Sequence, residues 1–187
     1  MFKQVLQNDE EILFEEGVNK KAFIKKGLLS GIGLSAFISC FPAQFITIAC
    51  AMITDGGKGI MIVWPISWAI IFVIGIILSY VITKLESKNT YFAVTNKRII
   101  KRYGAFNNKY VHYSLKNVGT VMVSGSIFDT DESANLIVSV KDFHMNTDGH
   151  TSPLKLTVKS LNRAYEAYNV LSEKVEGNNE VLRIKSE

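Results

Sequence analysis

The sequence contains little cysteine, and its cysteines are placed where they cannot pair with each other. Cys40 and Cys50 lie in one apolar run, and a helix would hold them about 15 Å apart, too far for a disulfide bond. We expect both to be small apolar side chains. The low cysteine content therefore excludes a disulfide framework and a thiolate metal site.

Charge is absent from two long stretches, 27–54 and 59–83. As helices they would be roughly 37–42 Å long, enough to cross a hydrocarbon core of about 30 Å. Two buried helices of a soluble core are the alternative, but the rest of the chain is too short to cover both. The sequence therefore predicts a transmembrane helical hairpin over 27–83, with helices at 27–53 and 59–83 and a turn at 54–58.

Ionisable side chains are missing from both spans, which argues against the proton relays and ion paths of transporters. A cleaved signal is not expected, because the first span is too long for a signal's apolar region. Lysines collect before the first span and after the second, whereas the turn between the spans contains only Lys58. The flanking lysines are Lys20, Lys21, Lys25, Lys26, Lys84 and Lys88. This asymmetry predicts an integral protein of the cytoplasmic (inner) membrane with both termini in the cytoplasm.

Small residues recur at every fourth position of the first span and at the same spacing in the second. Those expected to form a helix-packing stripe are Gly27, Gly31, Ser35 and Ser39 in the first span and Gly75 and Ser79 in the second. A narrow face of small residues lets another helix backbone approach closely. We expect the stripe to pack within the hairpin, and the alternative is a seam between copies of the chain.

Residues 1–26 are interpreted as a cytoplasmic leader. Within them the stretch NDEEILFEE (8–16) fits the start of a helix, with Asn8 or Asp9 as the capping residue. It fits a short strand equally well, formed by its ILF between acidic residues. The sequence does not choose between these two structures.

After Lys88 the sequence changes to short runs rich in β-branched and aromatic residues, separated by turn residues. Strands are predicted at 90–95, 98–103, 109–115, 120–124, 136–141 and 154–159. Apolar residues then recur three or four positions apart, which predicts an amphipathic helix ending near Gly177, followed by a polar tail at 177–187. Residues 88–176 are therefore expected to form an α+β, mainly β domain: a bent antiparallel sheet or barrel capped by a C-terminal helix.

One pattern in this region resembles a known family. Its residues are Tyr91, Val94, Thr95, Asn96, Arg98, Ile99, Ile100 and Gly104, followed by Tyr113, Ser114, Leu115, Val118, Val121 and Val123. The pattern resembles the bacterial pleckstrin-homology-like (bPH) family, in particular membrane-associated members with a preceding hydrophobic hairpin. The resemblance covers roughly 88–175 and implies a PH-like barrel capped by a helix. The sequence departs from the family pattern at SIFDTDESAN (126–135), where relatives often have a glycine-rich turn.

Basic residues dominate the stretch from Lys88 to Lys116, which contains no acid and directly follows the second span. A basic segment beside an anionic leaflet gains about 1 kcal/mol per Lys or Arg. The resemblance implies that the first hairpin of the domain holds phosphorylated headgroups where these are bound. The candidates for contact with lipid headgroups or other anions are Lys97, Arg98, Lys101, Arg102 and Lys109. The alternative is that Arg98 serves the turn while the others form a solvated face.

Other functions have less support in the residues. A pI of about 9.0 with interleaved tyrosines fits nucleic acid, but the membrane anchor already accounts for the basic bias, so no nucleic-acid partner is expected. The cluster DFHMNTDGH matches no familiar metal-ligand spacing and is read as a solvated loop; its ligand types are Asp142, His144, Asp148 and His150. With no phosphate-cradling glycine loop and no nucleophile elbow, we expect no enzyme, no metal and no cofactor.

These observations together predict a membrane-anchored cytoplasmic module for binding or scaffolding. It is expected to contact lipid headgroups or a protein partner, without catalysis. The alternative is a homo-oligomeric structural membrane protein, assembled through the PH-like domain and the small-residue stripe.

Overall fold

The computed structural model describes residues 2, 5–53, 58–145 and 151–184. The chain divides into two units. The first, called the domain here, joins Met1–Phe23 to Glu86–Glu187, and the second, called the hairpin, consists of Ile24–Leu85. The residues before the apolar runs therefore belong with those after them.

Two long helices occupy the middle of the chain, α1 (Lys20–Ile53) and α2 (Lys58–Asn89). Both continue past the predicted spans at their domain ends, because charged residues such as lysine do not interrupt a helix. The segments Lys20–Ile46 and Val63–Asn89 are long and apolar enough to cross a membrane. Only 17% and 6% of their most apolar windows are buried by the rest of the chain.

The described strands form two antiparallel sheets. The first has the order β1-β2-β3-β4 and contains β1 (Ile12–Gly17), β2 (Tyr91–Thr95), β3 (Arg98–Tyr103) and β4 (Lys109–Ser114). The second has the order β5-β6-β7 and contains β5 (Val118–Ser124), β6 (Ser133–Met145) and β7 (Thr151–Asn162). A short 3-10 helix, Leu115–Asn117, connects the sheets, and α3 (Ala164–Ile184) follows them.

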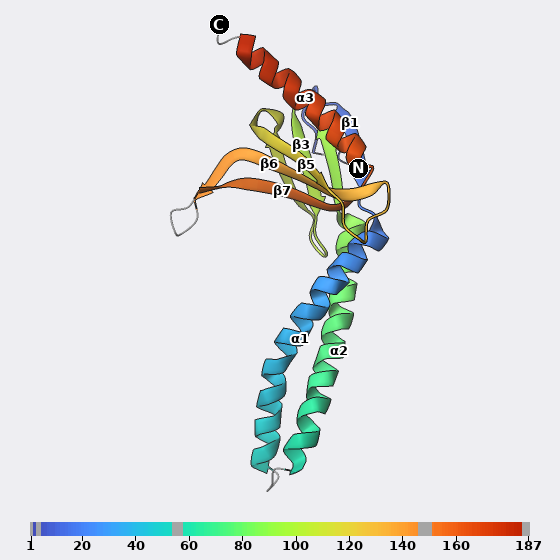
Figure 1. The fold of residues 1–187 in the computed structure, drawn as a ribbon, viewed down its shortest axis with the longest axis vertical. Helices are drawn as coiled ribbons and strands as arrows, with labels where there is room; N and C mark the ends of the chain where they lie inside the picture. Colours follow the sequence, from blue (N-terminus) through green and yellow to red (C-terminus); the bar gives the residue numbers. More distant parts are fainter. Residues whose placement is uncertain (1, 3–4, 54–57, 146–150, 185–187) are drawn as a thin grey trace. The chain divides into compact units, whose positions relative to one another are not determined.

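This architecture confirms the predicted α+β fold with a C-terminal helix, as two open sheets rather than a closed barrel. Figure 1 shows α3, in red, running across the strands of the domain. The core between them contains fully buried side chains such as Phe92, Leu136, Leu161 and Leu171. The helix continues to Ile184, through part of the predicted polar tail, because a helical glycine such as Gly177 costs only about 1 kcal/mol.

The stretch Ile12–Gly17 forms a strand, which decides between the two structures that its sequence allows. β1 pairs antiparallel with β2, and its Phe14 is buried in the core of the domain. The segment expected to be a leader therefore contributes an edge strand, and the folded domain extends beyond the expected bounds of 88–176. The chain leaves the domain after β1, forms the hairpin, and returns as the neighbouring strand β2.

Candidate functional site

The first sheet has two ends, and the chain passes to the helices at only one of them. β1 ends at Gly17, which pairs with Tyr91 at the start of β2. We call this the joining end. The opposite end is called the distal end. The register places Arg102, Tyr103 and Lys109 toward the joining end and Ile12, Thr95, Arg98 and Ser114 at the distal end.

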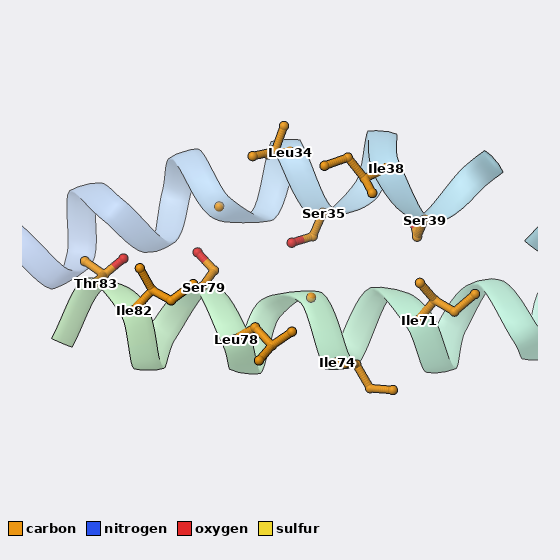
Figure 2. A pocket seen from close by; sticks show the side chains of 12 residues that line it. Leu34, Ser35, Ile38, Ser39, Ile71, Ile74, Leu78, Ser79, Ile82 and Thr83 are labelled. Atoms are coloured by element: carbon orange, nitrogen blue, oxygen red, sulfur yellow. The ribbon is translucent and has the colours of Figure 1, made fainter. Parts of the chain in front are cut away.

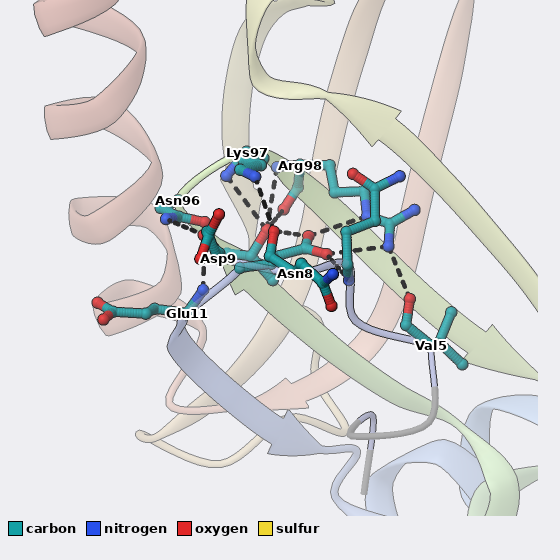
Figure 3. Close-up of polar contacts among 10 residues, drawn as sticks. Val5, Asn8, Asp9, Glu11, Asn96, Lys97 and Arg98 are labelled. Carbon is teal, nitrogen blue, oxygen red and sulfur yellow. Dashed lines mark hydrogen bonds and ion pairs between the residues drawn. The ribbon is translucent and has the colours of Figure 1, made fainter.

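At the distal end, Arg98 is held by the residues that precede β1, which we call the N-terminal segment. Its Nε donates to Glu10 Oε1 at 2.9 Å, and its Nη2 donates to Glu10 Oε2 at 3.0 Å and to the Val5 carbonyl at 2.8 Å. The Glu10 side chain has no exposed surface, and that of Arg98 is only 12% exposed. Figure 3 shows this segment facing the β2–β3 turn. The guanidinium therefore forms a bidentate ion pair inside the domain.

The surroundings of Glu10 favour its ionised form. The hydrogen bond from Arg98 lowers the pKa of Glu10 to about 2, although burial acts in the opposite direction. The Thr95 hydroxyl donates to Oε1 at 2.7 Å, and the backbone N–H of Gln7 donates to Oε2 at 2.9 Å. The carboxylate thus connects the N-terminal segment to β2 and β3.

Lys97 is exposed in the β2–β3 turn at the distal end. Its Nζ donates to the Asn8 carbonyl at 3.1 Å, and the neighbouring Asn96 side chain donates to the Asp9 carbonyl at 3.2 Å. A cavity of about 310 Å³ lies here. It is lined by Asn96, Lys97, Ser114, Leu115 and Lys116. Lys97 is therefore a cation within reach of a ligand at the distal end.

Lys101 points from β3 toward the second sheet. Its Nζ donates to the Thr157 carbonyl of β7 at 2.6 Å and lies 5.1 Å from the centre of the Tyr103 ring. Burial lowers the pKa of Lys101 below its ordinary value. The ammonium group therefore connects the two sheets.

Arg102 and Lys109 lie toward the joining end. In the sheet register Arg102 stands between Tyr91 of β2 and Tyr110 of β4, on the opposite face of β3 from Lys101. Its Nε is buried and has no hydrogen-bond partner within the described part of the chain. Lys109 is exposed at the start of β4. The structure thus distributes the five candidates over both ends and both faces of the sheet, and it does not gather them into one pocket.

The small-residue stripe lies between the two helices of the hairpin. Figure 2 shows Ser35 of α1 and Ser79 and Thr83 of α2 pointing toward the opposite helix. A methyl group added at Gly31 would overlap the Ser79 side chain, and one added at Gly75 would lie 2.9 Å from the Ser35 hydroxyl.

The remaining stripe residues lie in the same seam. A methyl group at Gly27 would overlap Thr83, and the Ser39 hydroxyl is buried and donates to the Ala36 carbonyl at 3.0 Å. An apolar cavity of about 530 Å³ follows this seam. Since the stripe packs within the hairpin in this arrangement, an oligomer would have to use a different surface.

Metal-ligating side chains do not gather in groups of three or more in the part of the chain that the structure describes. Of the cluster singled out in the sequence, the side chains of Asp142 and His144 and the whole of Asp148 and His150 lie outside the described residues.

The sequence interpretation missed Glu10 as the partner of Arg98. The two residues are 88 positions apart, with the whole hairpin between them, so no local pattern connects them. The only available signal was the acidic run that contains Glu10, in a segment that could form a strand.

A model of the family described as "Bacterial PH domain" matches residues 33–175. The match covers more than half of the chain, and the chain belongs to the bacterial PH domain family. It begins inside α1, so it includes most of the hairpin and is wider than the resemblance at 88–175. Searches of curated proteins and of solved structures found no match. PH domains are a binding-type family, which supports a binding or scaffold module in general terms.

Proposed function

We propose that this chain is a membrane-anchored binding module, in which the hairpin holds the PH domain at the cytoplasmic face of the inner membrane. The observation that carries the proposal is the exposure of the two apolar helices. Side chains such as Phe37 and Phe45 are 67% and 73% exposed. Removing one large apolar side chain from water gains about 1.5–3 kcal/mol. The rest of the chain does not cover these side chains, whereas a lipid bilayer would cover them.

The connectivity of the fold supports an anchor with two crossings. Because the hairpin lies between neighbouring strands of one sheet, both of its ends must return to the same domain. Two crossings place both ends on one side of a membrane. The exposed lysines near the ends of the helices favour the cytoplasmic side; they are Lys20, Lys21, Lys25, Lys84 and Lys88.

The proposed contacts of the module differ at its two ends. Lys109, exposed at the joining end, is the candidate for anionic lipid headgroups. Lys97, beside the distal cavity, is the candidate for a protein partner or a soluble anion. Arg102 offers a buried N–H donor between two tyrosines. Arg98 and Lys101 are proposed to serve the fold, because their donors are used by Glu10 and Thr157.

Alkaline carbonate extraction of membranes tests the anchor. The full chain should stay in the membrane pellet. In a matched variant, a short Gly/Ser linker replaces residues 24–85, so that the segment after β1 leads directly to the segment before β2. This variant should be released as a soluble protein. Release of the full chain by carbonate would contradict the proposal.

A further inference from the structure

Two loops of the domain are tied to the residues where the helices begin and end. Asn89, the last residue of α2, donates its side-chain N–H to the carbonyls of Gly104 at 3.0 Å and Ala105 at 3.3 Å, in the β3–β4 turn. Asn19, directly before α1, has its side-chain amide 3.5 Å from the Thr130 hydroxyl, in the β5–β6 loop. Both loops therefore lie at the joining end.

Each of these loops presents a large apolar side chain to solvent. Phe106 is 78% exposed and Ile127 is 91% exposed. Among the described residues of the domain these are the two most exposed large hydrophobic side chains. A single exposed apolar residue is ordinary, but these two share one end of the domain, where the chain enters the helices.

The turn that carries Phe106 has a defined conformation. Gly104 has a φ of 130°, a region in which a side chain is strained, and a methyl group there would overlap the carbonyl of Asn107. The Asn89 amide also holds this turn, through its hydrogen bonds to the Gly104 and Ala105 carbonyls. No acid lies between Lys88 and Lys116, so nothing in this turn opposes an anionic surface. The exposure of Phe106 is thus a feature of a fixed turn.

The chain limits how far the β3–β4 turn can be from the apolar span of α2, whatever the angle between the two units. α2 is continuous from Lys58 to Asn89, and a helix places Asn89 about 8 Å beyond Lys84, the first charge after the span. A headgroup region is about 5–7 Å thick on each side of the hydrocarbon core. The β3–β4 turn is therefore tied to a residue near the outer edge of the headgroup region.

We propose that Phe106 and Ile127 enter the interfacial region of the bilayer and fix the domain against the membrane next to its anchor. This inference rests on the proposed membrane anchor. The occupant that fits is a lipid surface, because a membrane crossed by α2 would lie close to Asn89, which holds the β3–β4 turn, and the β5–β6 loop shares this end of the domain. Aromatic and aliphatic side chains gain free energy at that depth.

Tryptophan quenching by brominated lipids tests the proposal on the full chain in vesicles of phosphatidylcholine and phosphatidylglycerol. The probes are Phe106→Trp and Ile127→Trp, each combined with Trp64→Phe and Trp68→Phe. Lys116→Trp in the same background is the control, because Lys116 is exposed at the distal end. We expect quenching at positions 106 and 127 to be several-fold stronger than at position 116, with emission shifted to the blue.

The native Trp64 and Trp68 of α2 separate the two proposals. If they are not quenched in the unmutated chain, the membrane anchor itself is wrong. If they are quenched while positions 106 and 127 behave like position 116, only the interfacial contact is overturned. Blue-shifted but unquenched emission at position 106 would also overturn it, since it would show that protein, such as a second copy of the chain, covers this side chain.

Discussion

The Glu10–Arg98 ion pair explains how a segment from before the hairpin becomes part of the domain after it. Both oxygens of the carboxylate accept from the guanidinium, and the Glu10 side chain is fully buried. Removing one partner of a buried pair leaves the other charge without compensation, which costs about 3–5 kcal/mol. Arg98, which the sequence pattern indicated as a candidate for contact with lipid headgroups, thus has a structural role in this ion pair.

Replacing Arg98 by alanine should destabilise the domain far more than replacing the neighbouring Lys97. We expect Arg98→Ala to lower the free energy of unfolding by about 3–5 kcal/mol, because Glu10 is left buried and unpaired. Lys97→Ala, at an exposed position, should change it by no more than about 0.5 kcal/mol. Denaturant unfolding of the full chain in detergent measures both. Equal effects of the two changes would contradict a structural role for Arg98.

The same pair predicts how stability depends on pH. Arg98 holds the pKa of Glu10 at about 2 in the folded protein, below its ordinary value of 4.5. A lowered pKa stabilises the fold above pH 4.5, and this contribution, about 3 kcal/mol, is lost as the pH falls toward 2. Glu10→Gln should therefore be less stable at neutral pH and should show a smaller loss between pH 4.5 and 2. An unchanged acid transition in this variant, followed by circular dichroism, would refute the assignment.

At the scale of elements, the hairpin depends on close approach of α1 and α2 along the small-residue stripe. Two glycines of α1 allow a matched comparison. A side chain at Gly31 would meet Ser79 of α2, whereas nothing lies within 4 Å of a methyl group at Gly33.

Gly31→Leu should separate the helices, and Gly33→Leu should not. Overpacking of this kind typically costs about 1–3 kcal/mol. We expect Gly31→Leu to lower the melting temperature of the detergent-solubilised chain, while Gly33→Leu leaves it close to that of the unmutated chain. If both substitutions have the same effect, the helices do not pack through this face.

The elements differ in how far the sequence could predict them. The hairpin and most strands follow from local patterns: long uncharged runs, and short runs of β-branched and aromatic residues between turns. β1 has a weaker pattern, because its apolar run is only three residues long before Glu15 and Glu16 and because its partner β2 lies beyond the hairpin. An edge strand with a distant partner cannot be recognised from its own residues.

The candidate site was less predictable than the fold, because each side chain depends on a distant contact. Basic residues in one strand have the same appearance in the sequence, yet Arg98 meets Glu10 and Lys101 meets Thr157. Alternation along β3 correctly separates Lys101 from Arg98 and Arg102, but it cannot say which face is covered. Which face of β3 is covered depends on the N-terminal segment, which contacts Arg98 on one face, and on the second sheet, which contacts Lys101 on the other.

At the scale of the whole molecule, the protein is a bacterial PH domain with a two-helix insertion between its first two strands. The insertion makes the hairpin and the domain depend on each other, since β1 and Glu10 come from before the hairpin and their partners from after it. A fragment that begins at residue 86 would lack both. We therefore expect studies of the domain to require the N-terminal residues as well.

The central claim, two crossings with the domain in the cytoplasm, is tested most directly by cysteine labelling in intact cells. In a background with Cys40→Ser and Cys50→Ser, a membrane-impermeant maleimide should label Lys58→Cys from outside. It should label Lys116→Cys only after the cells are lysed. Labelling of Lys116→Cys in intact cells, or protection of Lys58→Cys until lysis, would contradict the account.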